Sequence, residues 1–284
     1  MKTMRSVYTA LVLVFLYAPI LVMILFSFNS SPSTAVFEGF SFKWYGELFS
    51  KDEVGQALKN TLLLAFLSSL IATIIGTAAA VGLSKMKKAW RSPVMSVTNI
   101  PMMNPDIVTA VSLLMLFVFI SAVLGTSSRT FFTVLVAHIT FNLPYVVLSV
   151  LPKIRQIDKN LPEAARDLGC TPLQSFFKVE LPCLLPGILS GALMAFTLSL
   201  DDFIITQFTK GEGFYTLPTY IYSMTKKKVK PDMYALSTLI FVAILVLLLL
   251  INFISAKMDA KNQPQPQKRK RKTAQASKKE VSKL

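Results

Sequence analysis

Residues 163–182 read EAARDLGCTPLQSFFKVELP and lie between two strongly apolar stretches of this 284-residue chain. The segment is too polar to span a bilayer, yet it contains signals that start and end helices. Asn160 is a favourable N-cap, and the Glu163 side chain, three residues later, can reach back to the cap N–H. Gly169 stands where a left-handed C-cap would end such a helix. The pattern predicts a short helix closed by a glycine turn.

A second helix start follows this turn directly. Thr171 can cap, Pro172 suits the first helical position, and Gln174 completes a capping box. We expect this helix to stop before residue 182, where the chain enters the next apolar stretch. Two interpretations of Phe176 and Phe177 remain open: they pack on the ends of membrane spans, or they form a docking surface for a soluble partner.

Apolar stretches long enough to cross a membrane dominate the rest of the chain. Hydrophobic residues make up 53% of the sequence, the mean hydropathy is +0.54, and about 20 apolar residues suffice for one transmembrane helix. Six stretches qualify, at residues 7–28, 60–83, 94–123, 131–151, 183–208 and 234–256. The first is longer than the apolar part of a signal peptide, so we expect a retained helix. The sequence predicts an all-α membrane protein with six transmembrane helices.

Basic residues predict which side of the membrane each connection faces. With six spans both termini share a side, and most of the 30 Lys and Arg residues lie there. They fall near the N-terminus, between the second and third spans, in the insert at 153–182 and after residue 256. Since positive charge favours the cytoplasmic side, both termini and the insert are predicted to be cytoplasmic. The lysines at 226, 227, 228 and 230 oppose this rule.

The C-terminal segment differs in composition from the rest of the chain. Residues 257–284 are rich in Lys, Gln and Pro and account for much of the net charge of +15. Such a segment cannot form a packed core. We therefore predict a six-span domain at 1–256 and a disordered cytoplasmic tail at 257–284. The tail is expected to be solvated, although contact with anionic lipid is an alternative, and no nucleic-acid partner is expected.

Enzymatic signatures are missing from the sequence. It contains neither a G-x-x-x-x-G-K-[ST] phosphate loop nor a Rossmann fingerprint. His138 is the one histidine, so we expect it to be packed or hydrogen-bonded inside the bundle rather than to bind a metal. No nucleophile and base are paired in the sequence. We expect a chain that is not itself an enzyme and binds no metal or cofactor.

Two aspartates near the end of the fifth span are candidates for a cation path. A charged side chain in the bilayer costs about 2.5–3.5 kcal/mol, so carboxylates kept there usually face a pore or a partner. On a continuous helix Asp202 shares a small polar stripe with Ser199 and Thr206, whereas Asp201 lies about 100° away on an apolar stripe. We therefore expect Asp202 to face the path and Asp201 to lie at its edge or to hold a neighbouring helix.

A third acid, Asp106, follows Asn104-Pro105. Asn104 can cap a helix, Pro105 fits its first position, and Asp106 then lies in the first turn, where the helix dipole favours a carboxylate. Together with Pro101, this pattern predicts that the third span is broken, which is tolerated where backbone lines a cavity or is buried in protein. Asp106 is either a substrate contact or an ordinary helix start at the membrane edge.

The insert resembles the EAA motif of the permease subunits of ABC importers. It departs from the usual pattern mildly, since Val179 stands where Ile is more common. The resemblance implies a type I ABC importer permease (MetI-like) bundle with cytoplasmic coupling helices that dock on an ATPase subunit. The residues to which it gives this coupling role are Glu163, Ala164, Ala165, Asp167, Gly169, Leu181 and Pro182.

Further stretches resemble the spermidine/putrescine permeases of that family. They are NPDIVTAVSLLMLF from Asn104, SLDDFIITQF from Ser199 and LPTYIYSMTKKKVKPDMYALSTLI from Leu217. The resemblance implies a polyamine permease in a bacterial inner membrane, surrounded by lipid. Its implied partners are a second permease subunit, two ATPase subunits that bind ATP, and an external substrate-binding protein.

Two alternatives remain open. One is the same machine with another cargo, such as thiamine, a metal ion, sulfate or a sugar. The other is an ATP-independent secondary transporter or channel, although the six spans show no obvious internal repeat of the kind common in such carriers.

Overall fold

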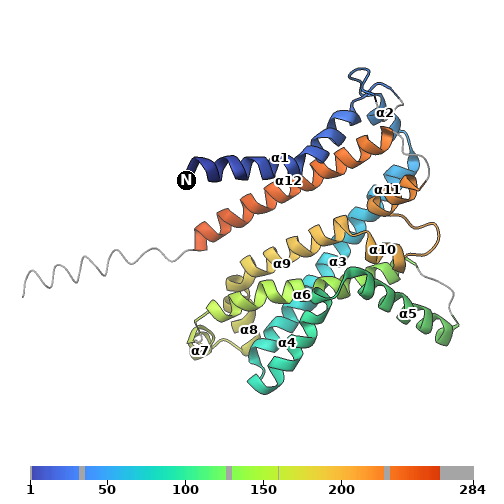
Figure 1. Cartoon of the computed structure of the whole chain (residues 1–284). Helices are drawn as coiled ribbons and strands as arrows, with labels where there is room; N and C mark the ends of the chain where they lie inside the picture. Colours follow the sequence, from blue (N-terminus) through green and yellow to red (C-terminus); the bar gives the residue numbers. More distant parts are fainter. Residues whose placement is uncertain (1, 32–35, 126–129, 159, 227–230, 263–284) are drawn as a thin grey trace, which may run out of the picture.

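The computed structural model describes residues 2–31, 36–125, 130–158, 160–226 and 231–262. Within these ranges the regular structure is helical, apart from an isolated bridge between Asn29 and Phe40. In chain order the helices are α1 (Lys2–Ser27), α2 (Lys43–Phe49), α3 (Asp52–Lys85), α4 (Lys88–Met103), α5 (Asp106–Leu124), α6 (Phe131–Gln156), α7 (Asn160–Asp167), α8 (Pro172–Ser175), the π-helical turn η1 (Phe176–Glu180), α9 (Leu181–Asp201), α10 (Ile204–Thr209), α11 (Leu217–Thr225) and α12 (Pro231–Asn262). Figure 1 shows their arrangement.

The predicted all-α architecture with six spans is confirmed. The helical segments long and apolar enough to cross a membrane are Met4–Ser27, Asp52–Lys85, Asp106–Val123, Phe131–Gln156, Pro172–Asp201 and Asp232–Leu250. They agree with the predicted stretches in order and number. The third span begins later than predicted, at Asp106, and the fifth begins earlier and ends earlier, at Asp201.

A break between α4 and α5 explains the short third span. The predicted interruption is present, because Asn104 and Pro105 both adopt extended backbone between the two helices. Pro105 imposes this conformation on the residue before it. The expectation that Asn104 caps the helix was wrong, since Pro105 occupies the cap position and no side chain caps α5. Asp106 does lie in the first turn of α5, as expected.

Helices α3, α6 and α9 form the centre of the bundle. Their shared core cluster consists of Ala72, Ala80, Leu83, Val146, Val147, Val150, Leu151 and Ala195. Gly76 on α3 lies so close to α6 that an added Cβ would be 2.7 Å from a methyl carbon of Val146. Gly191 on α9 approaches the same valine, because its added Cβ would be 3.2 Å from the Val146 Cα. Small residues let membrane helices approach closely, and here they bring three spans together.

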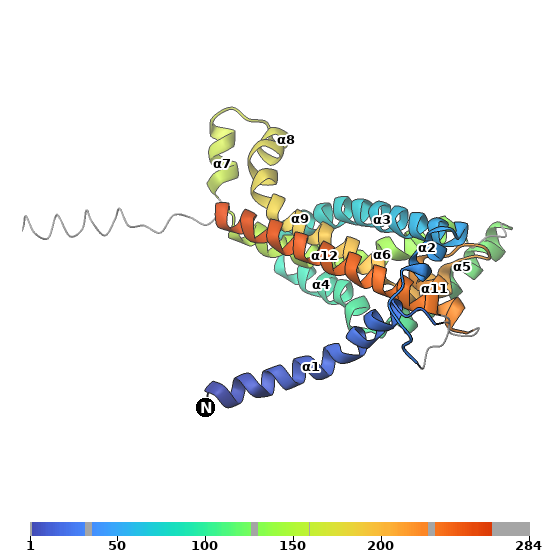
Figure 2. The same ribbon diagram turned by 90° about the horizontal axis from the view of Figure 1, so that it is seen from above.

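Helix α1 meets α12 at its C-terminal end, where the Phe26 and Tyr234 rings are in contact, and diverges from the bundle toward its N-terminus (Figure 2). The most apolar part of α1 has no buried residue. Its side chains are therefore available to lipid or to another subunit. Helix α12 continues to Asn262, past the predicted domain boundary at 256, and residues 263–284 of the predicted tail lie outside the described residues.

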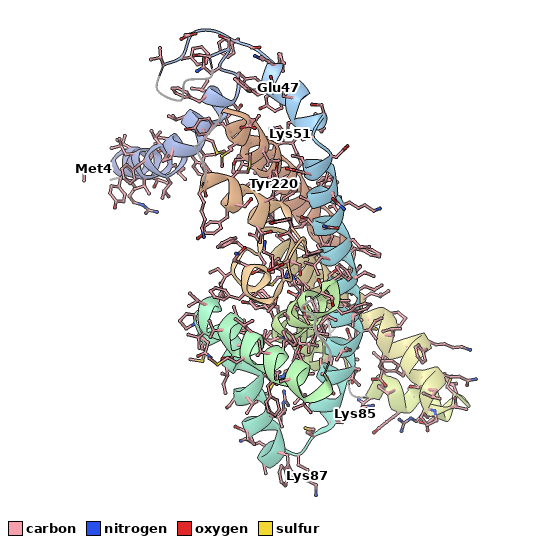
Figure 3. The ribbon with its side chains drawn as sticks, turned by 90° about the vertical axis from the view of Figure 1, so that its right-hand side faces the viewer. Met4, Glu47, Lys51, Lys85, Lys87 and Tyr220 are labelled. Carbon is pink, nitrogen blue, oxygen red and sulfur yellow. The ribbon has the colours of Figure 1, made fainter. Side chains whose placement is uncertain are left out.

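The two ends of the bundle differ in what they carry. The N-terminal end of α1, the C-terminal end of α12 and α7 lie toward the left of Figure 1, whereas α2 and α11 lie toward the right. At the α2 end, Lys51 forms an ion pair with Asp232, and the Tyr220 hydroxyl donates a hydrogen bond to Glu53 at 3.1 Å (Figure 3). Of the opposing lysine cluster, Lys226 is described and lies over the Tyr222 ring, while residues 227–230 lie outside the described ranges.

Candidate functional site: the coupling helices and a polar helix break

The polar insert forms two short helices that project from the bundle (Figure 2). Helix α7 starts at Asn160, whose backbone N–H donates to the Asp158 carboxylate at 3.0 Å. The predicted N-cap at Asn160 was therefore wrong, because Asp158 supplies the capping oxygen and Asn160 is already helical. The position of Glu163 in the first turn still suits the helix dipole.

The turn after α7 has the predicted chemistry. Gly169 has a φ of +89°, the left-handed conformation that glycine adopts without strain. Its N–H donates to the Arg166 carbonyl at 2.8 Å, and the Cys170 N–H donates to the Ala165 carbonyl at 3.1 Å. These two bonds make a Schellman motif, which satisfies carbonyls at the end of a helix.

The second helix begins with the predicted capping box. The Gln174 N–H donates to the Thr171 hydroxyl oxygen at 3.3 Å, and the Thr171 N–H donates to the Gln174 side-chain oxygen at 3.1 Å. The Ser175 hydroxyl donates to the Pro162 carbonyl at 3.2 Å and ties the second helix to the first. The two coupling helices are thus held together by a turn at one end and by a side-chain bond along their length.

The second helix does not stop before residue 182, contrary to our expectation. It continues through the π-helical turn η1 into α9, so helical backbone runs from Pro172 to Asp201. Pro182 lies at the start of α9, and a proline there has no N–H and would clash with a carbonyl in an unchanged α-helix. Widening the preceding turn, in which the Leu181 N–H donates to the Phe176 carbonyl, accommodates this ring.

Three apolar side chains of the coupling helices are exposed. Leu168 is 87% exposed, Leu173 71% and Phe177 60%. Phe176 is half-buried and meets Phe177 edge to face, with the ring centroids 5.3 Å apart. Phe177 is thus the more accessible of the two rings, and both interpretations of the pair stay predictions.

The residues assigned to coupling lie together in this projection. Glu163, Ala164, Asp167, Gly169 and Pro182 are exposed, Leu181 is half-buried and Ala165 is buried. Ala165 is covered because α7 leans on α8 and η1, so it acts in packing while its neighbours face outward. An exposed acidic and apolar surface on a tightly closed pair of helices is suited to binding another protein.

A second site lies where α9 ends and α10 begins. The Asp202 carboxylate accepts hydrogen bonds from the Ile205 N–H at 3.2 Å and from the Thr206 N–H at 2.8 Å. It also accepts one from the Thr206 hydroxyl at 2.8 Å. Asp202 therefore caps the N-terminus of α10, where a carboxylate is favoured by both hydrogen bonding and the helix dipole.

His138 on α6 completes this network and is buried, as expected. Its Nε2 lies 3.3 Å from the Asp202 carboxylate and 2.9 Å from the Thr206 hydroxyl. An Nε2–H at this position would donate to the Asp202 carboxylate, which accepts hydrogen bonds when it is ionised. The His138 Nδ1 lies 3.1 Å from the Ser199 hydroxyl on α9.

Ser199 extends the network to a second residue of α6 and to one further helix, α3. Its hydroxyl oxygen accepts a hydrogen bond from the Asn142 amide at 2.8 Å and lies 2.9 Å from the Ser68 hydroxyl on α3. Ser68 and Asn142 were not predicted as site residues. Their polar side chains within otherwise apolar spans are a signal, but the sequence does not say which neighbours they meet.

The continuous helix that the predicted polar stripe required is absent. The stripe assumed unbroken helix from Ser199 to Thr206, whereas α9 ends at Asp201 and Asp202 has extended backbone. Ser199 and Thr206 are buried among α3, α6 and α10, and Asp202 is nearly so. Asp201, in contrast, is exposed. The structure thus separates the two neighbouring acids into one internal and one external carboxylate.

Asp106 lies at an equivalent place on a neighbouring helix. It is exposed and opens α5, just as Asp202 opens α10. Helices α5 and α10 pack against each other, since Ala110 and Ile205 belong to one core cluster. Each of these residues lies within about a turn of its helix start, so Asp106 and the Asp201–Asp202 pair flank the same region of the bundle.

Known permease proteins are similar in sequence to most of this chain. The "Putrescine transport system permease protein PotI" of Escherichia coli K12 is 40% identical over 242 residues, 84% of this chain and 86% of that protein. The "Spermidine/putrescine transport system permease protein PotC" of Haemophilus influenzae is 37% identical over 254 residues, 89% of this chain and 97% of that protein.

Solved structures agree on the fold. A bacterial ABC transporter for the import of alginate matches with a TM-score of 0.72 at 21% identity, covering 90% of this chain and 94% of that chain. The MetNI methionine ABC transporter matches with a TM-score of 0.56 at 22% identity, covering 73% of this chain and 97% of that chain.

The family whose sequence pattern matches is described as "Binding-protein-dependent transport system inner membrane component", and the match spans residues 72–262. This range includes the coupling helices and all three aspartates. It is a family of transport subunits, not of enzymes, and its importers work with ATPase subunits and a binding protein. The chain belongs to this family of inner-membrane permease subunits of ABC importers.

Proposed function

We propose that this chain is a permease subunit of a polyamine importer. The observation that carries the proposal is the identity of 37–40% over most of the chain to permeases named for putrescine and spermidine. Relatives named for alginate or methionine transport are only 20–22% identical and support the fold alone. The proposed cargo is therefore an organic polycation rather than thiamine, a metal ion, sulfate or a sugar.

Exposed carboxylates at the helix breaks support a cationic cargo. Asp106 and Asp201 are open on the surface of the isolated chain, near the region where α5 and α10 pack. An ammonium group would bind them through charge-assisted hydrogen bonds. We propose that these two carboxylates contact the cargo, and that Asp202, Ser199 and Thr206 hold the break in place from inside.

The coupling helices would transmit movements of the ATPase subunits to the carboxylates that contact the cargo. We propose that the exposed surface at Glu163, Ala164, Asp167 and Gly169 docks on an ATPase subunit, with Ala165 packing behind it and Leu181-Pro182 leading into α9. Their closed, tied geometry supports a docking role because a loose loop would absorb motion instead of transmitting it. The ATPase subunits bind ATP in this proposal, and this chain binds no cofactor.

The proposed assembly contains this chain, a second permease subunit, two ATPase subunits and an external binding protein in a bacterial inner membrane. Both termini and the coupling helices face the cytoplasm. The abundance of basic residues at this end supports the orientation. Lipid surrounds the bundle, and no nucleic acid takes part.

Reconstitution tests the proposal directly. The complete complex and its binding protein are placed in liposomes, and ATP hydrolysis is measured with spermidine, putrescine, thiamine, sulfate and a neutral sugar. Stimulation by spermidine or putrescine is the expected result. Stimulation confined to any other solute would contradict the polyamine proposal while leaving the family assignment intact.

A further inference from the structure

A polar cavity of about 270 Å³ opens at the end of the bundle that carries α11. The start of α3, the loop after α10 and α11 itself form its walls. Figure 3 shows Tyr220, a lining residue, at the opposite end of the bundle from Lys85. The volume lies just below the usual range for small-molecule sites, so a small ligand or one end of a longer ligand fits. Six of the lining residues are polar: Glu53, Gln56, Asn60, Tyr215, Tyr220 and Ser223.

The hydrogen-bond donors of this lining are largely used within the protein. The Tyr220 hydroxyl donates to the Glu53 carboxylate at 3.1 Å, and the Ser223 hydroxyl donates to the Tyr220 carbonyl at 2.7 Å. The Asn60 amide donates to the Tyr215 carbonyl at 3.0 Å. The polar atoms that remain are mainly acceptor oxygens, from one carboxylate, two side-chain amides and three hydroxyls. Such a lining suits a ligand that donates hydrogen bonds.

Glu53 gives the cavity a negative charge. It is the one charged residue of the lining, and among the described residues it forms no ion pair. Burial and the Glu53 carboxylate raise the pKa of Tyr220 to about 12, so that hydroxyl stays neutral and remains a donor to Glu53. A single carboxylate is a poor site for a divalent metal ion, which requires several oxygen ligands of suitable charge. The cavity is therefore suited to an organic ammonium group.

The Tyr215 ring already lies beside a positive charge. The Lys210 Nζ is 4.0 Å from the ring centroid, which makes a cation–π contact. None of the described lysines lines the cavity itself. Lys210 is held on the ring, and Lys51 forms an ion pair with Asp232. The cavity thus lies next to an aromatic ring that accommodates a cation, while these two lysines are engaged outside it.

Helix α11 connects the cavity to the break between α9 and α10. Tyr222 on α11 meets Phe203, the residue after Asp202, with the ring centroids 4.5 Å apart. Tyr220 and Ser223 lie on either side of Tyr222 in this helix, which has nine residues and a length of about 13 Å. The cavity and the break therefore share one short helix.

We propose that this cavity binds one alkylammonium end of a polyamine on the outer face of the complex. The ammonium lies between the Glu53 carboxylate and the neighbouring acceptor oxygens, and the adjoining methylene groups contact Ala57 and Met224, which also line the cavity. Charge-assisted hydrogen bonds stabilise this end of the ligand. The inference rests on the polyamine function proposed above, and it adds a binding site that neither Asp106 nor Asp201 lines.

Cysteine protection in the assembled complex tests this site. Ser223→Cys is introduced into a chain that carries Cys170→Ser and Cys183→Ser, and complexes in nanodiscs react with N-ethylmaleimide while the mass of the subunit is followed. Neither ATP nor the binding protein is present. Putrescine should slow the labelling of Ser223→Cys, whereas butane-1,4-diol and magnesium chloride should not. Thr225→Cys is the control, since Thr225 is exposed on the same helix and does not line the cavity.

The carboxylate is tested with a matched pair of variants. Glu53→Gln should raise the putrescine concentration for half-maximal protection about fivefold, the upper end for one exposed ion pair. Asp52→Asn should leave it unchanged, because Asp52 lies in the same helical turn and does not line the cavity. Gln56→Cys, at an exposed lining position on α3, gives the same readout if Ser223→Cys disturbs α11.

Three results would overturn the proposal. The first is equal protection by butane-1,4-diol or magnesium chloride, which would remove the selectivity for an alkylammonium group. The second is the same half-protection concentration in wild type and Glu53→Gln. The third is protection by the binding protein and none by putrescine, which would assign the cavity to a lysine side chain of that protein. Because the assay needs no turnover, it can fail when ATP hydrolysis responds to a polyamine, and succeed when hydrolysis responds to another cargo.

Discussion

Substitution of Gly169 tests the coupling role of the insert without removing the insert from the protein. A Cβ at this glycine would meet no atom within 4 Å, so an alanine introduces no clash. The cost comes from the backbone alone, because a φ of +89° is strained for any residue with a side chain. That strain is about 1–2 kcal/mol, which changes the ratio of native to alternative turn conformations by about 5- to 30-fold.

Proline at the same position adds two further penalties. It cannot adopt a positive φ, and it removes the N–H that donates to the Arg166 carbonyl at 2.8 Å, a bond worth about 0.5–1.5 kcal/mol. The assay is binding-protein-stimulated ATP hydrolysis by the reconstituted complex, with subunit content measured alongside. Gly169→Ala should lower stimulation severalfold, and Gly169→Pro should lower it more than about tenfold, both with normal membrane insertion.

Gly125 provides the matched control. It ends α5 with a φ of +63°, and its added Cβ also meets nothing within 4 Å. Gly125→Ala therefore carries a similar backbone strain at a place far from the coupling helices. The reasoning is refuted if Gly169→Pro transports at the wild-type rate, or if Gly125→Ala reduces stimulation as much as Gly169→Ala.

Three further predictions concern the rest of the bundle. Asp201→Asn should raise the KM for polyamine uptake and leave the melting temperature unchanged. Asp202→Asn should lower the melting temperature, because a buried capping charge is lost. The reverse pattern in uptake kinetics and thermal melting would exchange the roles of the two residues. Gly76→Ala should destabilise the subunit by about 1–3 kcal/mol through overpacking. Gly82→Ala should stabilise it by about 0.4–1 kcal/mol, because the added Cβ meets nothing within 4 Å. Equal melting temperatures of the two variants would count against the packing argument. Burial and a carboxylate partner raise the pKa of Tyr220 to about 12. The stability that its neutral hydroxyl contributes is therefore complete below pH 10.0 and is lost as pH rises through about 12. An absorbance titration in which Tyr220→Phe removes a tyrosine that ionises near pH 10 would contradict this.

The parts of the fold that were predictable from sequence rest on local signals. The turn at Gly169 and the capping box at Thr171 need only neighbouring residues, and both were found as expected. The six spans follow from runs of apolar composition. The break before Asp106 follows from two prolines that oppose a continuous helix.

The polar network depends on contacts that are distant in sequence and was not predictable in the same way. His138 meets Ser199 and Thr206 from another part of the chain, and nothing in the local pattern pairs them. The stripe argument for Asp202 failed for a related reason, because it assumed the helix continued where the carboxylate instead caps a new one. Helical periodicity is informative only within a helix whose ends are known.

Helix α9 gives the subunit the properties of a lever. Its 21 residues, Leu181–Asp201, span about 30 Å at the rise of an α-helix. One end follows the proposed ATPase-docking surface, and the other ends at an exposed carboxylate. A tilt of about 5° at the first end moves the second by about 3 Å over this arm, about the length of a hydrogen bond. In the proposed mechanism, a small rotation at the coupling helices would be sufficient to make or break an ammonium contact at Asp201.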